Sequence, residues 1–257
     1  MKFDSTIYKK GVYDEALIYD AWLKNTNERD LFKNFLQKRI DKWATKSPLS
    51  VVEVGSGSGA AGIRVMEILR NAGIEYHYTG VEPSEDQIRS FQKKNREDLN
   101  VSFVTSSLQK FNPEKKFDIA FVVHFLYYVE DLVEALKKID TFSEKVVIVH
   151  HGPHGINEIH KAFRKHVKKG PHIISTYDDI ATALKEAGIP YSFDSFPSHV
   201  DITSIKEADN ETGKKMIQFF LERTDLSNDV IEQVRNYFRA QPDIMTQEVG
   251  IFITNHD

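Results

Sequence analysis

The feature that most constrains this chain is an apolar run that breaks into a glycine-rich turn. Residues 51–54 read Val-Val-Glu-Val, residues 55–59 read Gly-Ser-Gly-Ser-Gly, and a helix-like segment follows at once. β-Branched residues favour a strand. Glycines directly after a first strand let the backbone approach a bound ligand closely. This order predicts the first strand–turn–helix unit of a parallel sheet, with a ligand site at the turn.

The next predicted strand, residues 77–82, ends in the carboxylate of Glu82, and Pro83 stops it. An acid after a second strand can accept hydrogen bonds from both hydroxyls of a ribose. The glycine turn and Glu82 together therefore indicate an adenosine-bearing cofactor. Two structural alternatives stay open. The glycines also suit a turn that needs positive φ, and Glu82 also suits a surface acid at a helix N-terminus.

Ser84 and Gln87 also have two interpretations. Residues 84–87 read Ser-Glu-Asp-Gln, which fits a capping box in which Ser84 caps a helix and Gln87 reaches back to it. That pattern explains both residues without any ligand. The alternative interpretation is that Gln87 binds a ligand.

The remaining chain alternates strand-like and helical runs, which predicts βαβ units in an α/β, Rossmann-like fold. The N-terminal segment 13–46 is predicted to be helical, with a break at residues 25–27 and Asn27 as an N-cap. The late pair of strands has no crossover between them, which predicts an antiparallel edge. Helices should cover both faces of the sheet. The predicted strands are residues 50–54, 77–82, 101–104, 117–123, 145–150, 191–204 and 247–254, and the predicted helices lie within residues 60–72, 84–98, 131–140, 156–168, 177–187 and 210–240.

A chain of 257 residues without repeats or a Pro/Gly linker is expected to form one domain. Residues 1–46 would form a helical cap and residues 47–155 a cofactor-binding core. Residues 156–257 would form the substrate-side half, with helical inserts and the C-terminal strands.

The end of the fourth strand is the expected place for chemistry. Residues 117–123 are followed by His124, and Tyr127 and Tyr128 come shortly after. In an open α/β sheet, ligands bind beyond the carboxyl ends of the strands where the strand order reverses. The first and fourth strands would flank that point, so these three side chains should face cofactor and substrate. Alternatively, His124 only shapes the turn or touches the cofactor backbone, and the tyrosines are packing residues.

Composition narrows the classes of partner. The formal net charge of −4 argues against nucleic acid, and no apolar run approaches the length of about 18–20 residues that a membrane span needs. With no cysteine there is no disulfide, thiol nucleophile or cysteine zinc site. The first residues lack the apolar core of a signal peptide. We expect a cytoplasmic protein, a monomer, that acts on a small molecule.

The histidines raise the question of a metal. The chain has 10 of them, with His150, His151 and His154 close together. No H-E-x-x-H or paired-cysteine spacing of a common zinc site is present in the sequence. We therefore expect no bound metal.

Several segments together resemble the histamine N-methyltransferase family of class I S-adenosylmethionine-dependent methyltransferases. Residues 53–59 resemble the first motif of that class. Residues 81–88 (Val-Glu-Pro-Ser-Glu-Asp-Gln-Ile) and 125–131 (Phe-Leu-Tyr-Tyr-Val-Glu-Asp) resemble two further family segments. Weaker likenesses lie at residues 176–180, 194–196 and 199–203, and at residues 19–23 with Glu28 beyond them, so the resemblance spans about residues 10 to 254.

The resemblance implies S-adenosyl-L-methionine as cofactor, with S-adenosyl-L-homocysteine as product. It also implies a class I methyltransferase sheet with a substrate lid of N-terminal and late helices. The implied cofactor residues are Glu53, Gly55, Ser56, Gly57, Gly59, Glu82, Pro83, Ser84, Gln87, Ser106, Val123 and His124. The implied substrate residues are Tyr19, Trp22, Glu28, Gln87, Tyr127, Tyr128, His160, His172, Gln247 and Glu248. The implied catalytic residues are Glu28, His124, Tyr127 and Tyr128.

The resemblance implies that Glu28 holds a substrate amine. His124 stands where the family has a glutamine. His160 and His172 replace an aromatic residue and a cysteine, and Gln247 or Glu248 stands at a late asparagine. These changes leave methyl transfer intact and point to N-methylation of a small imidazole or amine, with a histidine-like substrate fitting better than a decarboxylated one. The alternatives are a sensor that binds the cofactor without turnover and a dinucleotide-dependent oxidoreductase, which the glycine spacing disfavours.

Overall fold

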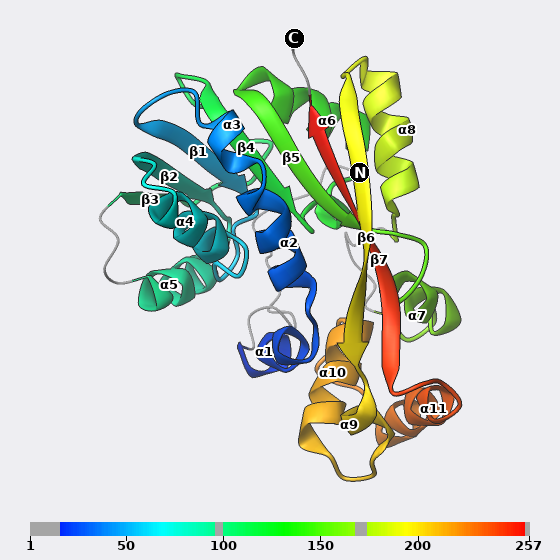
Figure 1. The fold of residues 1–257 in the computed structure, drawn as a ribbon. Coiled ribbons are helices and arrows are strands. Elements are labelled where there is room, and N and C mark those ends of the chain that lie inside the picture. Colours follow the sequence, from blue (N-terminus) through cyan, green and yellow to red (C-terminus); the bar gives the residue numbers. More distant parts are fainter. Residues whose placement is uncertain (1–15, 96–99, 168–173, 255–257) are drawn as a thin grey trace.

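Seven strands form one sheet, whose order is β3-β2-β1-β4-β5-β7-β6 (Figure 1). The computed structural model describes residues 16–95, 100–167 and 174–254. The strands are β1 (Leu49–Val54), β2 (Tyr76–Val81), β3 (Val101–Val104), β4 (Phe117–Val123), β5 (Ser143–His151), β6 (Tyr191–Asp201) and β7 (Ile244–Thr254).

The pairing of these strands confirms the predicted fold class. β1 lies parallel to both β2 and β4, and the pairs β2–β3 and β4–β5 are parallel as well. β7 runs antiparallel to β5 and to β6. The chain moves outward from β1 to β3 and then returns to β4 on the other side of β1. The strand order therefore reverses between β1 and β4, as the sequence predicts.

Helices cover both faces because the central strands are apolar on both sides. On β1, Val51 packs into one cluster and Val52 into the other, as the alternation of a strand requires. The first cluster is covered by α2 (Glu28–Gln37), α3 (Ile40–Trp43), α4 (Gly62–Asn71) and α5 (Glu85–Lys94). The second cluster is covered by α6 (Leu132–Thr141) and α8 (Tyr177–Ala187).

A third apolar cluster lies beyond one end of the sheet, where most of the remaining helices gather (Figure 1). Trp22 is buried there, stacked on the ring of Phe219 at 5.0 Å between centroids. The helices of this part are α1 (Ala16–Asn25), α7 (Ile156–Ala162), α9 (Thr203–Lys206), α10 (Glu211–Leu221) and α11 (Asn228–Arg239).

A predicted helix cap and a predicted strand end differ in the structure, each because of a specific hydrogen bond. Asn27 does precede α2, but its side chain does not cap that helix, because its Oδ1 accepts the backbone N–H of His199 at 2.8 Å and ties the helices to β6. The strand expected over residues 191–204 ends at Asp201. Its carboxylate accepts the N–H of Thr203 at 2.9 Å and turns the chain into α9.

The helix expected over residues 156–168 is also shorter. In the structure α7 ends at Ala162, and turns follow it. Within the described residues, every helix is too short or too polar to cross a bilayer.

Candidate active site

The glycine-rich turn after β1 has the backbone that the sequence predicts. Gly55, Gly57 and Gly59 have φ values of 72°, 51° and 85°, a region that side chains disfavour. A Cβ on Gly55 would collide with the ring of Phe125. Among the described residues, and leaving aside its two chain neighbours, a Cβ on Gly57 would meet no atom within 4 Å, so the backbone of Gly57 borders open space.

The carboxylate of Glu82 lies directly beside this turn. Its Oε2 accepts the N–H of Gly57 at 3.0 Å, and its Oε1 accepts the N–H of Ser84 at 3.0 Å. Glu82 is buried at the end of β2. An open backbone and a buried carboxylate are therefore neighbours, which is the pairing that an adenosine-bearing cofactor requires.

The other predicted cofactor residues lie around this pair. Ser84 caps α5, because its Oγ accepts the N–H of Gln87 at 3.4 Å, which bears out the capping role of Ser84. Ser106 lies beside Glu82 and donates its N–H to the Glu82 carbonyl at 3.3 Å. Pro83 directly follows Glu82. Val123 is the last residue of β4.

Glu53 precedes the turn, and Ser56 lies within it. Glu53 is buried behind it, where its carboxylate accepts the hydroxyl of Tyr78 beneath Gly62. Burial raises the pKa of Glu53 to about 8, so this carboxyl is largely protonated at neutral pH. The buried Oγ of Ser56 has no hydrogen-bond partner among the described residues.

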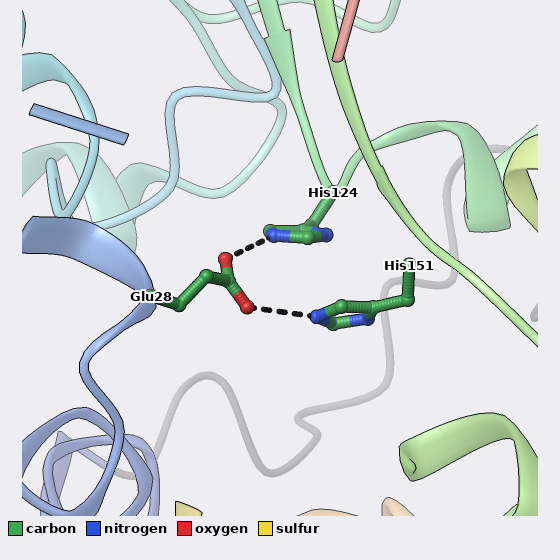
Figure 2. Close-up of side chains that lie close together, drawn as sticks. All are labelled: Glu28, His124 and His151. Carbon is green, nitrogen blue, oxygen red and sulfur yellow. Dashed lines mark hydrogen bonds and ion pairs between the residues drawn. The ribbon is translucent and has the colours of Figure 1, made fainter. Parts of the chain in front are cut away.

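A second buried polar group surrounds Glu28, and Figure 2 shows its centre. Oε1 of Glu28 accepts from Nε2 of His124 at 2.5 Å and from Nη1 of Arg29 at 2.6 Å. Oε2 accepts from Nε2 of His151 at 2.9 Å and from Nε2 of Gln247 at 2.9 Å. Only 1% of Glu28 is exposed, so these contacts replace water almost completely.

Each member of the Glu28 group comes from an element end or from the middle of the sheet. Glu28 is the first residue of α2, where the helix dipole favours an acid. His124 directly follows β4, and His151 is the last residue of β5. Gln247 is in β7, which pairs with β5. The group therefore sits at the carboxyl ends of the parallel strands.

Charge in this group is fixed by its surroundings. Burial alone would raise the pKa of Glu28, but His124, Arg29 and His151 together hold it well below the ordinary value, so Glu28 is an anion. Burial lowers the pKa of His124 to about 4, against the opposing effect of Glu28, so His124 is neutral at pH 7. Burial would lower the pKa of Arg29, yet Tyr19 and Glu28 keep it raised, so Arg29 is a cation.

Tyr127 supports the group from the β4 side. Its hydroxyl is hydrogen-bonded to Nδ1 of His151 at 2.9 Å and accepts the backbone N–H of His151 at 3.1 Å. Its ring stacks on His150 at 4.0 Å between centroids. The hydroxyl of Tyr128 instead donates to Glu222, the residue directly after α10, at 3.4 Å.

Some of the remaining predicted substrate residues reach the Glu28 group, and others have partners elsewhere. Tyr19 reaches the Glu28 group, because its hydroxyl accepts from Nη2 of Arg29 at 3.2 Å, and Gln247 belongs to the group directly. Glu248 has a different partner, since it accepts from the hydroxyl of Tyr177 at 2.9 Å. Trp22 is buried in the third apolar cluster and His160 is buried on α7, while His172 lies outside the described residues.

Two members of the group, Arg29 and His151, are not among the site residues predicted from the sequence. His151 follows from the strand-end rule that points to His124, since it ends the fifth strand and could therefore face the pocket. Arg29 follows an acid on a helix, a pattern typical of a solvated surface. No local signal marks it as a buried cation.

Comparison with known proteins adds independent information. Residues 51–144 match the family model described as a methyltransferase domain. The chain is 22% identical to histamine N-methyltransferase A of Xenopus laevis over 93% of this chain and 91% of that protein. It is 24% identical to the mouse (Mus musculus) histamine N-methyltransferase, covering 85% and 82%. It is 28% identical to carnosine N-methyltransferase 2 of Gallus gallus, covering 68% and 60%.

Solved structures share the fold. A putative sarcosine dimethylglycine methyltransferase from Galdieria sulphuraria superposes with a TM-score of 0.55 at 11% identity, covering 87% of this chain and 84% of that one. The magnesium protoporphyrin IX methyltransferase of Synechocystis with bound S-adenosylhomocysteine gives 0.52 at 14% identity, covering 88% and 82%. At this level of identity, the likeness concerns the arrangement of the sheet and its helices.

Proposed function

We propose that this S-adenosylmethionine-dependent methyltransferase, which is similar to histamine N-methyltransferases, methylates a nitrogen of a small molecule that carries an imidazole or an amine. The matched relatives are named for histamine and carnosine, and both of these molecules contain an imidazole ring. A histamine- or histidine-like compound is therefore the proposed substrate class.

The observation that carries this proposal is the position of the Glu28 group next to the glycine turn. His124 contacts Glu28, and the next residue, Phe125, packs beneath Gly55. A nitrogen compound held by the Glu28 group would thus lie beside a cofactor held by the turn and Glu82. Tyr127 borders the same group and supplies an aromatic face that favours a positive charge.

The chain's own residues would have a modest chemical task. When bound, S-adenosylmethionine supplies an activated methyl group on a sulfonium, so the protein mainly has to position the accepting nitrogen and exclude water. The turn and Glu82 would hold the cofactor. The buried polar group would orient the nitrogen, and the anion Glu28 would offset positive charge in the site.

The rest of the site is proposed from the resemblance to the histamine N-methyltransferase family. Residues 47–155 would hold the cofactor, while residues 1–46 and 156–257 would enclose the substrate within a single, monomeric domain. The proposed cofactor contacts are Glu53, Ser56, Gly57, Glu82, Ser84, Gln87, Ser106 and Val123. The proposed substrate contacts are Tyr19, Trp22, Glu28, His124, Tyr127, Tyr128, His160, His172, Gln247 and Glu248.

The proposal is tested by calorimetric titration with S-adenosylmethionine, followed by mass-spectrometric turnover. The panel contains histamine, histidine, carnosine and aliphatic amines without a ring. We expect binding, together with the gain of one methyl group on an imidazole compound. Methylation of the aliphatic amines alone would exclude the imidazole part of the proposal, and binding with no turnover on any compound would favour a sensor.

A further inference from the structure

The carboxylate of Glu28 is already paired with a cation from the protein itself. Nη1 of Arg29 donates to its Oε1 at 2.6 Å, and Nε2 of His124 donates to the same oxygen. The other oxygen accepts from His151 and Gln247. A carboxylate offers about four lone-pair positions in all, so a substrate ammonium would have to displace one of these donors. The negative charge in this group is therefore matched before any ligand binds.

The same contacts argue against a metal ion. Glu28, His124 and His151 offer ligand atoms that all lie within 4.8 Å of one another. Two ligands of one ion, each about 2.1 Å from it, lie about 3 Å or more apart. Nε2 of His124 and Oε1 of Glu28 are 2.5 Å apart, the distance of a charge-assisted hydrogen bond. The Arg29 cation on the same oxygen also opposes a second cation.

Arg29 has more donors than the described protein fills. A guanidinium carries five N–H groups and has no acceptor. Nη1 donates to Glu28 and Nη2 donates to the hydroxyl of Tyr19 at 3.2 Å. Nε is buried and has no hydrogen-bond partner among residues 16–95, 100–167 and 174–254. The side chain keeps 12% of its surface exposed, so it is not completely enclosed. A buried donor of a cation without an acceptor is costly, which indicates a place for an anionic ligand.

The guanidinium lies between the two parts of the site. It shares Oε1 of Glu28 with the ring of His124, which follows β4. Its charge also reaches Glu53, just before the glycine turn. Burial raises the pKa of Glu53 to about 8, and Arg29 partly opposes that rise. Because Arg29 is hydrogen-bonded to Tyr19 and Glu28 and acts on Glu53 only through its charge, it belongs to the side proposed for the substrate.

We propose that Arg29 binds a carboxylate of the substrate, so that the enzyme acts on an amino-acid-like molecule rather than on the corresponding decarboxylated amine. This inference rests on the proposed function and makes its substrate class narrower. Nε and Nη2 lie along one edge of the planar guanidinium, which matches the two oxygens of a carboxylate.

The charges of the site suit a carboxylate as well. The sulfonium of a bound cofactor brings a positive charge into a buried place, and burying a charge is costly unless an opposite charge accompanies it. Glu28 is already matched by Arg29, so a substrate carboxylate supplies the missing negative charge. Glu28 and Tyr19 each hold one nitrogen of the guanidinium, which fixes its plane before the ligand arrives. In this arrangement Glu28 acts through Arg29, as a positioning residue.

Four compounds separate this inference from the proposed function, namely histidine, histamine, phenylalanine and phenethylamine. Within each pair, only the acid has the carboxylate, and the two pairs differ only in the ring. Calorimetry with full-length protein and S-adenosylhomocysteine measures their binding without turnover. We expect histidine to bind about 10- to 100-fold more tightly than histamine, in line with a hydrogen bond between charged groups.

Each outcome of this panel has one meaning. Equal affinities within both pairs, tighter binding of the amines, or no binding of either acid would overturn the inference. Equal binding of phenylalanine and histidine, each above its amine, would uphold the role of Arg29 and count against the imidazole part of the proposed function. Binding of the acids without any methyl transfer would defeat the proposed function and leave the inference standing.

Variants assign the preference to the guanidinium. Arg29→Gln should remove the preference for the acid. Arg29→Lys keeps a cation beside Glu28, which protects the fold, and should reduce the preference about 10-fold because an ammonium cannot form the planar fork. Arg39→Lys is the matched control and should keep the preference, since Arg39 lies beyond the other end of α2 and pairs with the exposed Asp194 at 3.1 Å. An unchanged preference in either folded variant of Arg29 would contradict the inference.

The carboxylate of the cofactor is the competing ligand for Arg29. S-adenosylhomocysteine carries this group, whereas methylthioadenosine lacks it. If the substrate supplies the carboxylate, Arg29→Lys should bind both compounds within about 2-fold of the wild type. A loss of about 10-fold or more for S-adenosylhomocysteine alone, with an unchanged ratio of histidine to histamine binding, would assign Arg29 to the cofactor and overturn the inference.

Discussion

Nε2 of His151 lies 2.9 Å from Oε2 of Glu28, although 123 positions separate the two residues in the chain. This contact joins the first turn of α2 to the end of β5 across the carboxyl ends of the central strands. It brings a helix that the sequence assigns to a cap into the centre of the polar site.

Replacing Glu28 with Gln should destabilise the protein strongly. The amide would turn two donors toward the donors already present, and the buried Arg29 cation would lose its partner. Breaking one side of a buried ion pair costs about 3–5 kcal/mol. Urea unfolding followed by fluorescence measures this loss. Glu67→Gln, which breaks the more exposed contact with Arg64, is the matched control and should cost less than about 1 kcal/mol. Similar losses for both variants would contradict the central role of Glu28.

Replacing Tyr127 with Phe should leave two polar atoms of His151 without this partner, because the hydroxyl is hydrogen-bonded to Nδ1 and also accepts the backbone N–H. The expected loss of stability is about 1–3 kcal/mol. Differential scanning calorimetry measures it as a lower Tm. The control is Tyr128→Phe, whose hydroxyl donates to Glu222 over the longer distance of 3.4 Å and should matter less. A larger effect at Tyr128 than at Tyr127 would refute this ranking.

The pKa of Glu53 leads us to expect that the stability of the protein depends on pH. Burial raises its pKa to about 8, above the value of about 4.3 for an exposed glutamate. The stability that it contributes is fully present below the unfolded pKa and is lost as pH rises toward about 8, since the folded state binds more protons in this window. Burial lowers the pKa of His124 to about 4, so its opposing effect is confined to pH values below about 6.5.

We therefore expect the free energy of unfolding to fall between about pH 6.5 and 8 by up to roughly 1 kcal/mol per pH unit. Glu53→Gln keeps the size and the neutral state of this side chain, and it should flatten the slope. Urea titrations at several pH values measure both proteins. An unchanged slope in the variant would assign the dependence to another group.

Replacing Gly57 with Ala should weaken cofactor binding more than stability. Gly57 has a φ of 51° and its backbone borders open space, so a methyl group there would meet the ligand rather than the protein. Gly73→Ala is a close control, because Gly73 has a φ of 68° and equally open surroundings but lies after α4. Both variants should lose about 1 kcal/mol of stability from backbone strain. Only Gly57→Ala should raise the Kd for S-adenosylmethionine by 10-fold or more, as measured by calorimetry.

The sequence is informative wherever the chemistry is local. The turn at residues 55–59, the carboxylate of Glu82 at the end of β2 and the cap at Ser84 are each readable from a few neighbouring residues, and the structure has them where they are expected. The parallel strands and their order around β1 and β4 follow from alternation and from the rule for crossovers. Asn27 shows where such local prediction fails. Its side chain does not cap the helix but accepts the N–H of His199, which lies 172 positions away in the chain.

By itself, the sequence determined the βα order of the chain, the glycine turn with its carboxylate and the identity of the residue at the end of β4, because periodicity and turn chemistry act over short stretches. Only the tertiary structure decided that Glu28, His151 and Gln247 meet, as they come from α2, β5 and β7 and up to 219 positions separate them. Their meeting depends on how one helix packs across the sheet. The tertiary structure also decided which groups of the site carry a proton, because a pKa depends on burial and on charges that distant segments supply.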